Sequence, residues 1–462
     1  MKLNSKKKLI SLMLVMILVI GSFAGCSTAK NKTNDSDNKG VETTEVPVDA
    51  KPAIDLGGYE FVLASHWVDD YSRVAGKSEL DDFILEQFAE IEKEYNCKIT
   101  FKHYSDPNMI AEEVTQSIMA GDKPFDVLDL PFGQYMSLLA ADTLYKINTI
   151  PEAEFDSSIY TPIVTNATTI NGNTYGLWFG VTDNLPGLFV NYQVIEKAGM
   201  ENPVELYKKG EWTWDKFREI CKGVSADTDG DGVKDQFGVG GDMLESVLLF
   251  SNNASYIKDN GNGSYVYNMN SPEAIEAANF ARQLRFEDNV IDPEEDWVAA
   301  AKNFTDNKTA FMTFFIWAAQ NEIGKNMEND YGFIPFPKGP SATEYGSPML
   351  DFRPFVMPKT LTDPEKTGII FHEIASRIGE ARSEAVFENY RDYGLDETGI
   401  EVFKTLLSTA TPDRAGSVPG LGDMSGVFKK VCMDLNLEPA SEFGAIESSM
   451  TELATEFYSK IK

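Results

Sequence analysis

The sequence predicts an α/β fold of two domains, from its length and from the order of its strand and helix patterns. About 410 residues follow the N-terminal region, which is too many for a single hydrophobic core. In the first folded stretch, short β-rich runs alternate with amphipathic helical patterns. This order is typical of a parallel sheet with right-handed crossovers. We therefore expect two domains, the first of them built on a parallel sheet.

The first predicted strand is Tyr59–Ser65, and the helix after it has Ser78 as its expected N-cap, with Asp81 three residues later. Apolar residues then recur at spacings of three and four as far as Tyr95, as on one face of a helix. The next expected elements are a strand over 97–104, a helix over 109–120, a strand over 125–130 and a helix over 132–140. Ligands of parallel sheets bind beyond the carboxyl ends of the strands, which here are 65–67, 104–106 and 129–131.

The middle and C-terminal parts of the chain are more helical. One helix is predicted to begin at Trp214. Another is predicted to begin at Pro272, because proline suits the first helical position. The second of these helices is expected to run to about Glu287. A further segment lies within 300–315, a strand lies within 331–337, and the last third is mainly helical. The sequence has no internal repeats, which argues against a calcium-dependent adhesion module.

The N-terminus resembles a bacterial lipoprotein signal. Lysines precede an apolar run of about 12 residues, Leu9–Ile20, which is too short for a comfortable transmembrane helix. Small residues lead to Cys26, which in a lipobox receives a diacylglycerol, with palmitate as an acyl chain, although Phe23 stands where leucine is usual. Residues 1–25 are therefore expected to be a signal peptide. Ordinary cleavage near Ala24, with Cys26 unmodified, is the alternative.

The segment after Cys26 supports an anchored protein. Residues 26–54 are rich in Ser, Thr, Asn, Asp and Lys and poor in large apolar side chains. Such a segment cannot bury enough surface to fold, so we expect a flexible tether. No later segment is long and apolar enough to span a membrane, so the lipid would be the chain's only contact with the membrane.

Charge and cysteine content exclude some partners. The formal net charge is -31, and losing the four lysines of residues 1–25 would bring it to about -35. This argues against nucleic acid or an anionic surface as a partner. Beyond Cys26, the cysteines are Cys97, Cys221 and Cys432, so at most one disulfide is possible; buried free thiols are the simpler expectation.

Several ordered motifs resemble the extracellular solute-binding proteins of family 1, the sugar-binding lipoproteins of ABC importers. The family's "WTWDEF" signature is similar to Glu211–Phe217, and its "YG…P-x-P" strand is similar to Tyr331–Pro337. Three further segments are similar to the family's "G-x-x-Y-G-x-P", "YN…F…AG" and "F…GKAAM…G-x-W" patterns: Asn171–Leu177, Leu188–Gly199 and Phe304–Trp317. The chain departs at Leu177-Trp178, where proline is usual, and at Asn307 and Phe315, where glycine is usual.

The resemblance implies a two-lobed periplasmic-binding-protein-like α/β fold, with a ligand cleft between the lobes and a hinge that crosses several times. It implies an N-terminal lobe of residues 55–163 plus 300–350 and a C-terminal lobe of 164–299 plus 351–462. It also implies a monomeric, lipid-anchored receptor outside the cytoplasm that captures an oligosaccharide for the permease subunits of an ABC transporter. The ligand would act by stabilising the closed arrangement of the lobes.

Aromatic and polar residues near the expected cleft are candidates for sugar contact. Sugar sites combine flat aromatic faces with planar polar groups. Trp67, Trp178 and Trp317 are the candidate stacking residues, whereas Trp212 and Trp214 are expected in a lobe core. The polar candidates for ligand contact are Asp129, Asp351 and Arg353. For each of them a structural ion pair or a helix cap is the alternative role.

The segment Asp227–Asp235 matches the start of a calcium loop. Carboxylates stand at positions 1, 3 and 5, glycine at 6, a backbone carbonyl at 7 and aspartate at 9. The expected Ca²⁺ ligands are Asp227, Asp229, Asp231, Val233 and Asp235. Position 12 is Gly238 rather than glutamate, so a bidentate ligand would come from elsewhere or from water. We expect a structural ion; the alternative is an acidic surface turn.

Signals of catalysis are poor, and we expect no enzyme activity. The histidines His66, His103 and His372 are widely spaced and show no metal-ligand pattern. The sequence contains neither a Gly-x-Ser-x-Gly elbow nor a phosphate-binding loop. The alternative to a receptor is a secreted carbohydrate-active enzyme, a glycosidase or lyase, on a lipid anchor.

Overall fold

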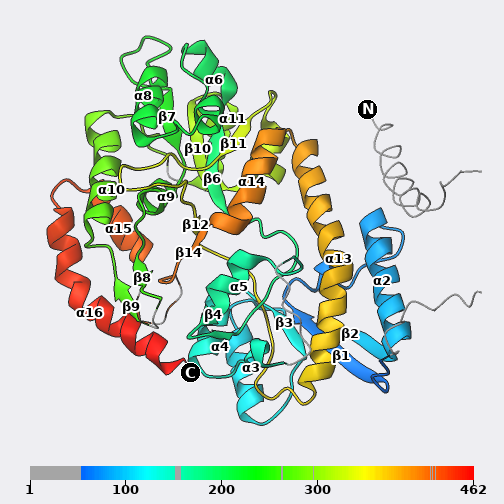
Figure 1. The fold of residues 1–462 in the computed structure, drawn as a ribbon. Coiled ribbons are helices and arrows are strands. Elements are labelled where there is room, and N and C mark those ends of the chain that lie inside the picture. The colour runs from blue at the N-terminus through cyan, green and yellow to red at the C-terminus, as the bar shows by residue number, and fades with distance from the viewer. Residues whose placement is uncertain are drawn as a thin grey trace, which may run out of the picture. The chain divides into compact units, whose positions relative to one another are not determined.

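The computed structural model describes residues 54–150, 158–261, 264–294, 296–416, 418, 420–421 and 423–461. The expected signal peptide, Cys26 and nearly all of the expected tether therefore lie outside the described residues. Figure 1 shows how the described helices and strands are arranged. Among the described residues, no helix is both long enough and apolar enough to cross a membrane.

The first sheet has the strand order β13-β3-β1-β2. Its strands are β1 (Tyr59–Ser65), β2 (Cys97–His103), β3 (Val127–Asp129) and β13 (Phe355–Val356). The pairs β1/β2 and β1/β3 are parallel, as the alternation of strands and helices predicted, and β13 adds an antiparallel edge. The carboxyl ends of β1 and β3 therefore meet at one edge of the sheet, with Ser65 paired to Asp129.

The helices around this sheet are α2 (Glu79–Tyr95), α3 (Ile110–Met119), α4 (Phe132–Ala140), α5 (Pro162–Thr168) and α13 (Pro364–Asp392), with the short η1 (Val68–Asp70) and η2 (Ile147–Thr149). The first three begin and end close to the predicted residues. Ser78 caps α2 as predicted, because its side chain accepts a 3.0 Å hydrogen bond from the Asp81 N–H. The long helix α13 contacts both α2 and β1 and runs beside α2 (Figure 1).

The second sheet has the strand order β11-β6-β10-β7. Its strands are β6 (Pro186–Val190), β7 (Phe237–Gly240), β10 (Thr309–Phe315) and β11 (Gly332–Ile334). Strand β10 runs parallel to β7 and antiparallel to β6. The adjoining helices are α6 (Tyr192–Lys197), α7 (Pro203–Lys208), α8 (Trp214–Val224), α9 (Leu244–Ser251), α10 (Pro272–Arg282), α11 (Trp297–Thr305), α12 (Glu322–Asn326), α14 (Glu397–Thr409), α15 (Met424–Met433) and α16 (Pro439–Lys460), with η3 (Gln283–Glu287) and η4 (Ile316–Gln320).

Short two-stranded pairs complete the described strands. They are β4 (Thr169–Ile170) with β5 (Asn173–Thr174), β8 (Ile257–Asp259) with β9 (Tyr265–Tyr267), and β12 (Pro348–Met349) with β14 (Thr411–Pro412). Along the chain, strand β12 lies between β11 of the second sheet and β13 of the first. The β12/β14 pair therefore belongs to the connection between the two larger sheets.

The division of the chain between the two sheets differs from the expected lobe boundaries. Residues 300–350 were expected in the N-terminal lobe, yet β10 and β11 pair with β6 in the second sheet. Residues 351–462 were expected in the C-terminal lobe, yet β13 pairs with β3 in the first sheet and α13 packs on α2. Strand β10 therefore completes the hydrogen bonding of β6 and β7, and the chain returns to the first sheet near residue 355, where β13 pairs with β3.

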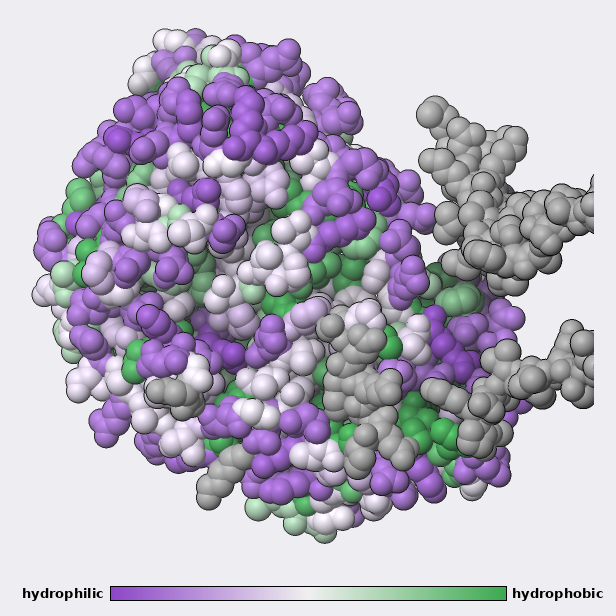
Figure 2. Space-filling model, in the orientation of Figure 1, coloured by the Kyte–Doolittle hydropathy of each residue, from purple (hydrophilic) through white to green (hydrophobic). Residues whose placement is uncertain are grey.

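Buried aromatic and aliphatic side chains fill the interior on both sides of this connection. Trp212 and Trp214 are buried, as expected for core residues, and Trp214 stacks on Phe280 with ring centroids 4.4 Å apart. Cys97, Cys221 and Cys432 are free thiols, as the simpler expectation had it. Figure 2 shows that the face turned to the viewer is mainly hydrophilic, with hydrophobic residues in small separate areas.

Candidate functional site

A buried ion pair stands at the carboxyl ends of β1 and β3. Asp129, the last residue of β3, is fully buried and accepts hydrogen bonds from Tyr71 (2.9 Å), Ser65 (3.2 Å) and Arg353. The Arg353 guanidinium also contacts Asp70, with Nη2 and the carboxylate oxygen 3.2 Å apart. Asp129 and Arg353 were separate candidates in the sequence, and the fold makes them partners.

The arginine of this pair is held in its charged form. Burial opposes the charge of Arg353, but Asp129, Tyr71 and Asp70 outweigh that penalty and raise the pKa of the guanidinium. Burial and the charge of Asp129 raise the pKa of Tyr71, so its hydroxyl stays protonated and remains a hydrogen-bond donor. Asp129 therefore has its hydrogen-bond donors within the fold, one arginine and two hydroxyl groups, and its role is structural.

The indole of Trp67 lies against this ion pair. The guanidinium carbon of Arg353 is 3.7 Å from the centroid of the Trp67 ring, which is cation–π distance. Trp67 is partly exposed, and Arg353 covers one of its ring faces. A ligand would therefore meet the part of the indole that Arg353 leaves uncovered.

Trp178 was expected to be a stacking residue for the solute, and it is instead part of the core. Only 5% of its surface is exposed, and it stacks on Phe355 with ring centroids 4.9 Å apart. Its indole N–H donates a 3.2 Å hydrogen bond to the carbonyl of Val181, so its polar atom is satisfied within the fold. Arg353 lies 5.4 Å from the Trp178 ring. Trp178 thus supports the arginine and offers little surface to a ligand.

Trp317 belongs to a second aromatic cluster, at the end of β10. Its ring packs at steep angles against Trp297 (centroids 5.2 Å apart) and Phe314 (5.1 Å), and Phe315 stacks nearby at 6.3 Å. Trp297, Phe315 and Trp317 are partly exposed. Within the described part of the chain, no ring contact joins Trp317 to Trp67 or Trp178. The expected surface of three converging indoles is therefore two separate clusters.

Hydrogen bonds connect the two clusters through the segments that cross between the sheets. The Ile316 N–H donates to the carbonyl of Leu185 (3.1 Å), and Asn184 donates from its side chain to Asp351 (3.1 Å). Asp351 is two residues before Arg353. These bonds link the carboxyl ends of β1 and β3, where Trp67, Asp129 and Arg353 lie, to the end of β10, where Trp317 lies. We call this linked region the sheet junction.

Two carboxylates of the sheet junction have neutral hydrogen-bond partners. Tyr390 of α13 donates to Asp183 (3.3 Å), and Asn184 donates to Asp351. Burial raises the pKa of both aspartates, although hydrogen bonds and Arg353 act in the opposite direction. Asp351 is nevertheless exposed to solvent.

The sequence reasoning found some of these residues and missed others. Asp70, Asp183, Asn184, Tyr390 and Trp297 were not singled out. Asp70 is three residues after Trp67, and Asp183 and Asn184 come shortly before β6 in the sequence. Their closeness to the end or start of a strand is the sequence feature that could have indicated them. Tyr390 lies near the C-terminal end of α13, and no local sequence pattern indicated that it would lie near Asp183.

The aspartate loop between α8 and β7 brings part of the expected calcium site together. Single carboxylate oxygens of Asp227, Asp229 and Asp235 lie within 4.8 Å of one another. The structure leaves Asp231 out of this group. Asp227 accepts hydrogen bonds from the Gly230 and Gly232 N–H groups, both 2.7 Å long, which fold the loop tightly around its first carboxylate. Three oxygen donors on a tight loop fit a hard cation such as Ca²⁺. Val233, expected to bind through its backbone carbonyl, exposes its side chain to solvent.

Comparison with known proteins identifies the family. The sequence profile of the bacterial extracellular solute-binding proteins matches residues 74–365. The chain belongs to this family. Comparison with curated protein sequences gave no match.

Solved structures of solute-binding proteins share the fold. UspC of Mycobacterium tuberculosis has a TM-score of 0.62 at 14% identity, covering 85% of this chain and all of UspC. The sugar-binding protein MalE of Xanthomonas citri has a TM-score of 0.62 at 13% identity, covering 86% of this chain and 98% of MalE. Lmo0181 of Listeria monocytogenes, solved with cycloalternan, has a TM-score of 0.56 at 16% identity, covering 86% and 98%. The two-lobed α/β fold is thereby confirmed.

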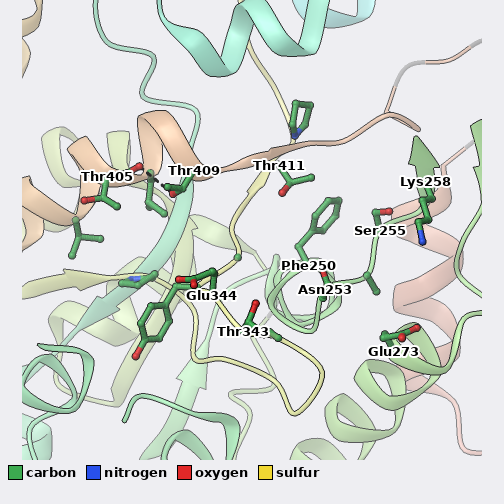
Figure 3. Close-up of a pocket in the computed structure, with 18 of the residues that line it drawn as sticks. Phe250, Asn253, Ser255, Lys258, Glu273, Thr343, Glu344, Thr405, Thr409 and Thr411 are labelled. Carbon is green, nitrogen blue, oxygen red and sulfur yellow. Dashed lines mark hydrogen bonds between the residues drawn. The ribbon is translucent and has the colours of Figure 1, made fainter. Parts of the chain in front are cut away.

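The solute-binding protein also has a large cavity away from the sheet junction, with a volume of about 1440 Å³ (Figure 3). Threonines of α14 and β14 line one part, Thr405, Thr409 and Thr411, and Lys258 and Glu273 lie on the other side (Figure 3). None of its lining residues comes from the first sheet or from α2, α3, α4, α5 or α13. A site around which two lobes close must draw residues from both, and the sheet junction meets this condition. The cavity is lined from the second-sheet side, and its lining residue Arg414 donates to the carbonyls of Ala167 (2.7 Å) and Asn166 (3.2 Å) in α5.

Proposed function

We propose that this solute-binding protein is a lipid-anchored receptor that captures an oligosaccharide outside the cytoplasm and delivers it to the permease subunits of an ABC transporter. Family membership supports capture of a solute, and the fold is that of MalE of Xanthomonas citri, a sugar-binding protein, and of Lmo0181, which was solved with cycloalternan. The receptor performs no covalent chemistry. It acts as a monomer, and its only contact with the membrane is the lipid at Cys26.

The observation that carries this proposal is the composition of the sheet junction. It combines partly exposed indoles, Trp67 and Trp317, with carboxylate and amide groups at the strand ends of both sheets. Aromatic faces pack against the CH-rich faces of sugar rings, and carboxylates and amides pair with their hydroxyl groups. Because the junction draws on both sheets, a ligand there would favour the arrangement in which the two lobes contact it together.

The aspartate loop is proposed to hold a structural Ca²⁺ ion. Asp227, Asp229 and Asp235 supply carboxylate oxygens, and the backbone carbonyl of Val233 and the side chain of Asp231 are the remaining proposed ligands. The loop lies between α8 and β7, at the start of β7, whereas the sheet junction lies at the carboxyl ends of the strands. The ion would therefore stabilise the second lobe without touching the bound solute.

The experiment that tests the receptor is a binding screen with a product check. Mature protein is titrated with a panel of oligosaccharides by calorimetry, and the sugars are recovered and analysed by chromatography. A receptor binds at least one oligosaccharide and returns it unaltered, and binding raises the melting temperature. Recovery of shortened sugars would support the carbohydrate-active enzyme instead. If no saccharide binds, the proposed ligand class is wrong.

A further inference from the structure

A large cavity lies beside the connection between the two sheets, apart from the proposed receptor site. Its volume of about 1440 Å³ exceeds the roughly 300–1,000 Å³ that is typical of small-molecule sites. Its lining residues come mainly from α7, the end of α9, β8, the loop before β12, α14 and β14 (Figure 3). The cavity therefore has room for a ligand of several rings.

Hydroxyl and amide side chains line this cavity. Thr405 and Thr409 come from α14, Thr411 comes from β14, and Thr343 and Asn253 come from the loops before β12 and after α9 (Figure 3). Within the described residues, no hydrogen bond joins the side chain of Thr343, Thr411 or Asn253 to another group of the protein. These groups are therefore free to donate to and accept from the hydroxyl groups of a bound molecule.

The cavity also holds charged side chains of both signs without a counter-ion. In the part of the chain that the structure describes, Lys258, Glu273 and Glu344 form no ion pair, whereas Arg414 contacts Asp259 at 3.8 Å. Lys258 and Glu273 lie on one side of the cavity, and Glu344 lies across from them (Figure 3). Hydrogen bonds between such charged groups and hydroxyls are about twice as strong as those between neutral groups.

Aromatic rings complete the lining. Tyr207 and Tyr345 are partly exposed and meet edge to face, with ring centroids 5.1 Å apart. Phe250, at the end of α9, also lines the cavity (Figure 3). Aromatic faces pack against the CH-rich faces of sugar rings. The cavity thus combines aromatic surface with hydroxyl, amide and carboxylate groups, as sugar sites do.

The cavity borders the connection between the sheets. Thr411 belongs to the β12/β14 pair, in which its N–H donates to the carbonyl of Ser347 (2.8 Å). Arg414 donates to the carbonyl of Ala167 in α5 (2.7 Å). None of the residues named for the sheet junction lines the cavity. A molecule in the cavity would therefore touch the connection without displacing a solute at the junction.

We propose that this cavity is a second binding site, which takes a neutral saccharide of several rings. The inference goes beyond the proposed receptor function, because the site is separate from the one that holds the transported solute. Sugar hydroxyls would meet the threonines, Lys258 and Glu344, and sugar ring faces would meet Tyr207 and Tyr345. Because unpaired charges of both signs line the cavity, a neutral ligand fits it better than a strongly charged one.

The test counts the saccharides that bind to each chain. Full-length mature protein is titrated by calorimetry with maltotriose, cellotriose, xylotriose and mannotriose. We expect at least one of these neutral trisaccharides to bind twice per chain, once in the cavity and once at the sheet junction. Trp317→Ala should weaken the junction event about tenfold and leave the cavity event unchanged.

Variants assign the second event to the cavity. Thr405→Trp and Thr409→Trp place an indole in the cavity and should each weaken the cavity event at least about tenfold. Both threonines are exposed, so the melting temperature should hold. Thr362→Trp is the matched control, because Thr362 is exposed and does not line the cavity. Glu344→Ala removes a polar contact without filling the space, and it should weaken the same event at least about threefold.

The outcomes separate this inference from the receptor function. A single event that Trp317→Ala weakens and the cavity variants leave unchanged overturns the second site and leaves the receptor in place. A single event lost in the cavity variants, and unaffected by Trp317→Ala, supports the cavity and overturns the sheet junction as the site of the solute. If no saccharide binds, the cavity site and the proposed receptor function are both wrong.

Discussion

Replacing Arg353 with methionine would expose how strongly the sheet junction depends on its buried ion pair. Methionine keeps much of the length and apolar surface of the arginine side chain but removes the guanidinium. Asp129, whose side chain is fully buried, would keep hydrogen bonds from Tyr71 and Ser65 and lose its cation. An ionised carboxylate without a charged partner in the interior is strongly unfavourable.

The expected cost is about 3 kcal/mol of unfolding free energy. Removing one partner of a buried ion pair typically costs about 3–5 kcal/mol. The lower end applies here because 21% of the Arg353 side chain is exposed, so that solvent already screens part of the interaction. Loss of the guanidinium from the face of Trp67, 3.7 Å away, adds a fraction of a kcal/mol to about 1 kcal/mol.

Urea unfolding followed by circular dichroism measures this cost. Arg391→Met is the matched control, because Arg391 pairs with Glu397 at the surface, where 34% and 72% of the side chains are exposed. Its loss should cost less than about 1 kcal/mol. Adding Asp129→Asn to Arg353→Met should recover about half of the lost stability, because the unpaired charge is gone. Equal costs for the two arginine variants, or additive costs in the double variant, would refute this account of the junction.

Four further expectations concern other parts of the chain. Cys26→Ser should release the protein from the membrane fraction with unchanged ligand affinity, and a variant that stays in that fraction would remove the proposed anchor. Chelation of divalent cations should lower the melting temperature of the parent and leave that of Asp229→Ala unchanged; identical curves for the parent with and without chelator would remove the ion. Trp317→Ala should weaken oligosaccharide binding about tenfold while the melting temperature holds, whereas Trp178→Ala should cost about 3–5 kcal/mol of stability because its indole is buried. Burial raises the pKa of Asp413 to about 6 in the folded protein, above its ordinary value of 3.8, so its contribution to stability should improve by about 2 kcal/mol as the pH falls from 7.5 to 4; Asp413→Asn should lack this contribution, and an unchanged pH profile would contradict it.

Local patterns predicted the first sheet and its helices well. The helix over 132–140 was predicted with the bounds that α4 has, and the cap at Ser78 forms the predicted hydrogen bond. These features depend on neighbours along the chain, such as the spacing of apolar residues and a side chain that accepts from an N–H three residues on. They are therefore encoded within a few turns of sequence.

The assignment of segments to lobes depends on contacts that no local pattern contains. Strand β10 was placed in the first lobe by resemblance, and it pairs with Phe189 and its neighbours, more than one hundred residues earlier. Trp178 shows the same limit on a smaller scale. Its place after a turn suggested a rim, but Phe355 from the returning chain stacks on it and buries it. Both errors come from contacts between segments far apart in the sequence, β10 with β6 in one case and Phe355 with Trp178 in the other.

The same return explains why the candidate site could be predicted residue by residue but not as an arrangement. Arg353 reaches Asp129 because the chain comes back from β12 to pair β13 with β3, 224 residues along the sequence from Asp129. On the way, Asp351 meets Asn184, which lies on the segment that leaves the first sheet for β6. Two crossing segments of opposite direction are thus held together at the sheet junction, one of them fixed to the first sheet by a buried ion pair. A solute bound at the sheet junction would touch both crossing segments at once, so its binding would favour the arrangement of the lobes in which both segments contact it.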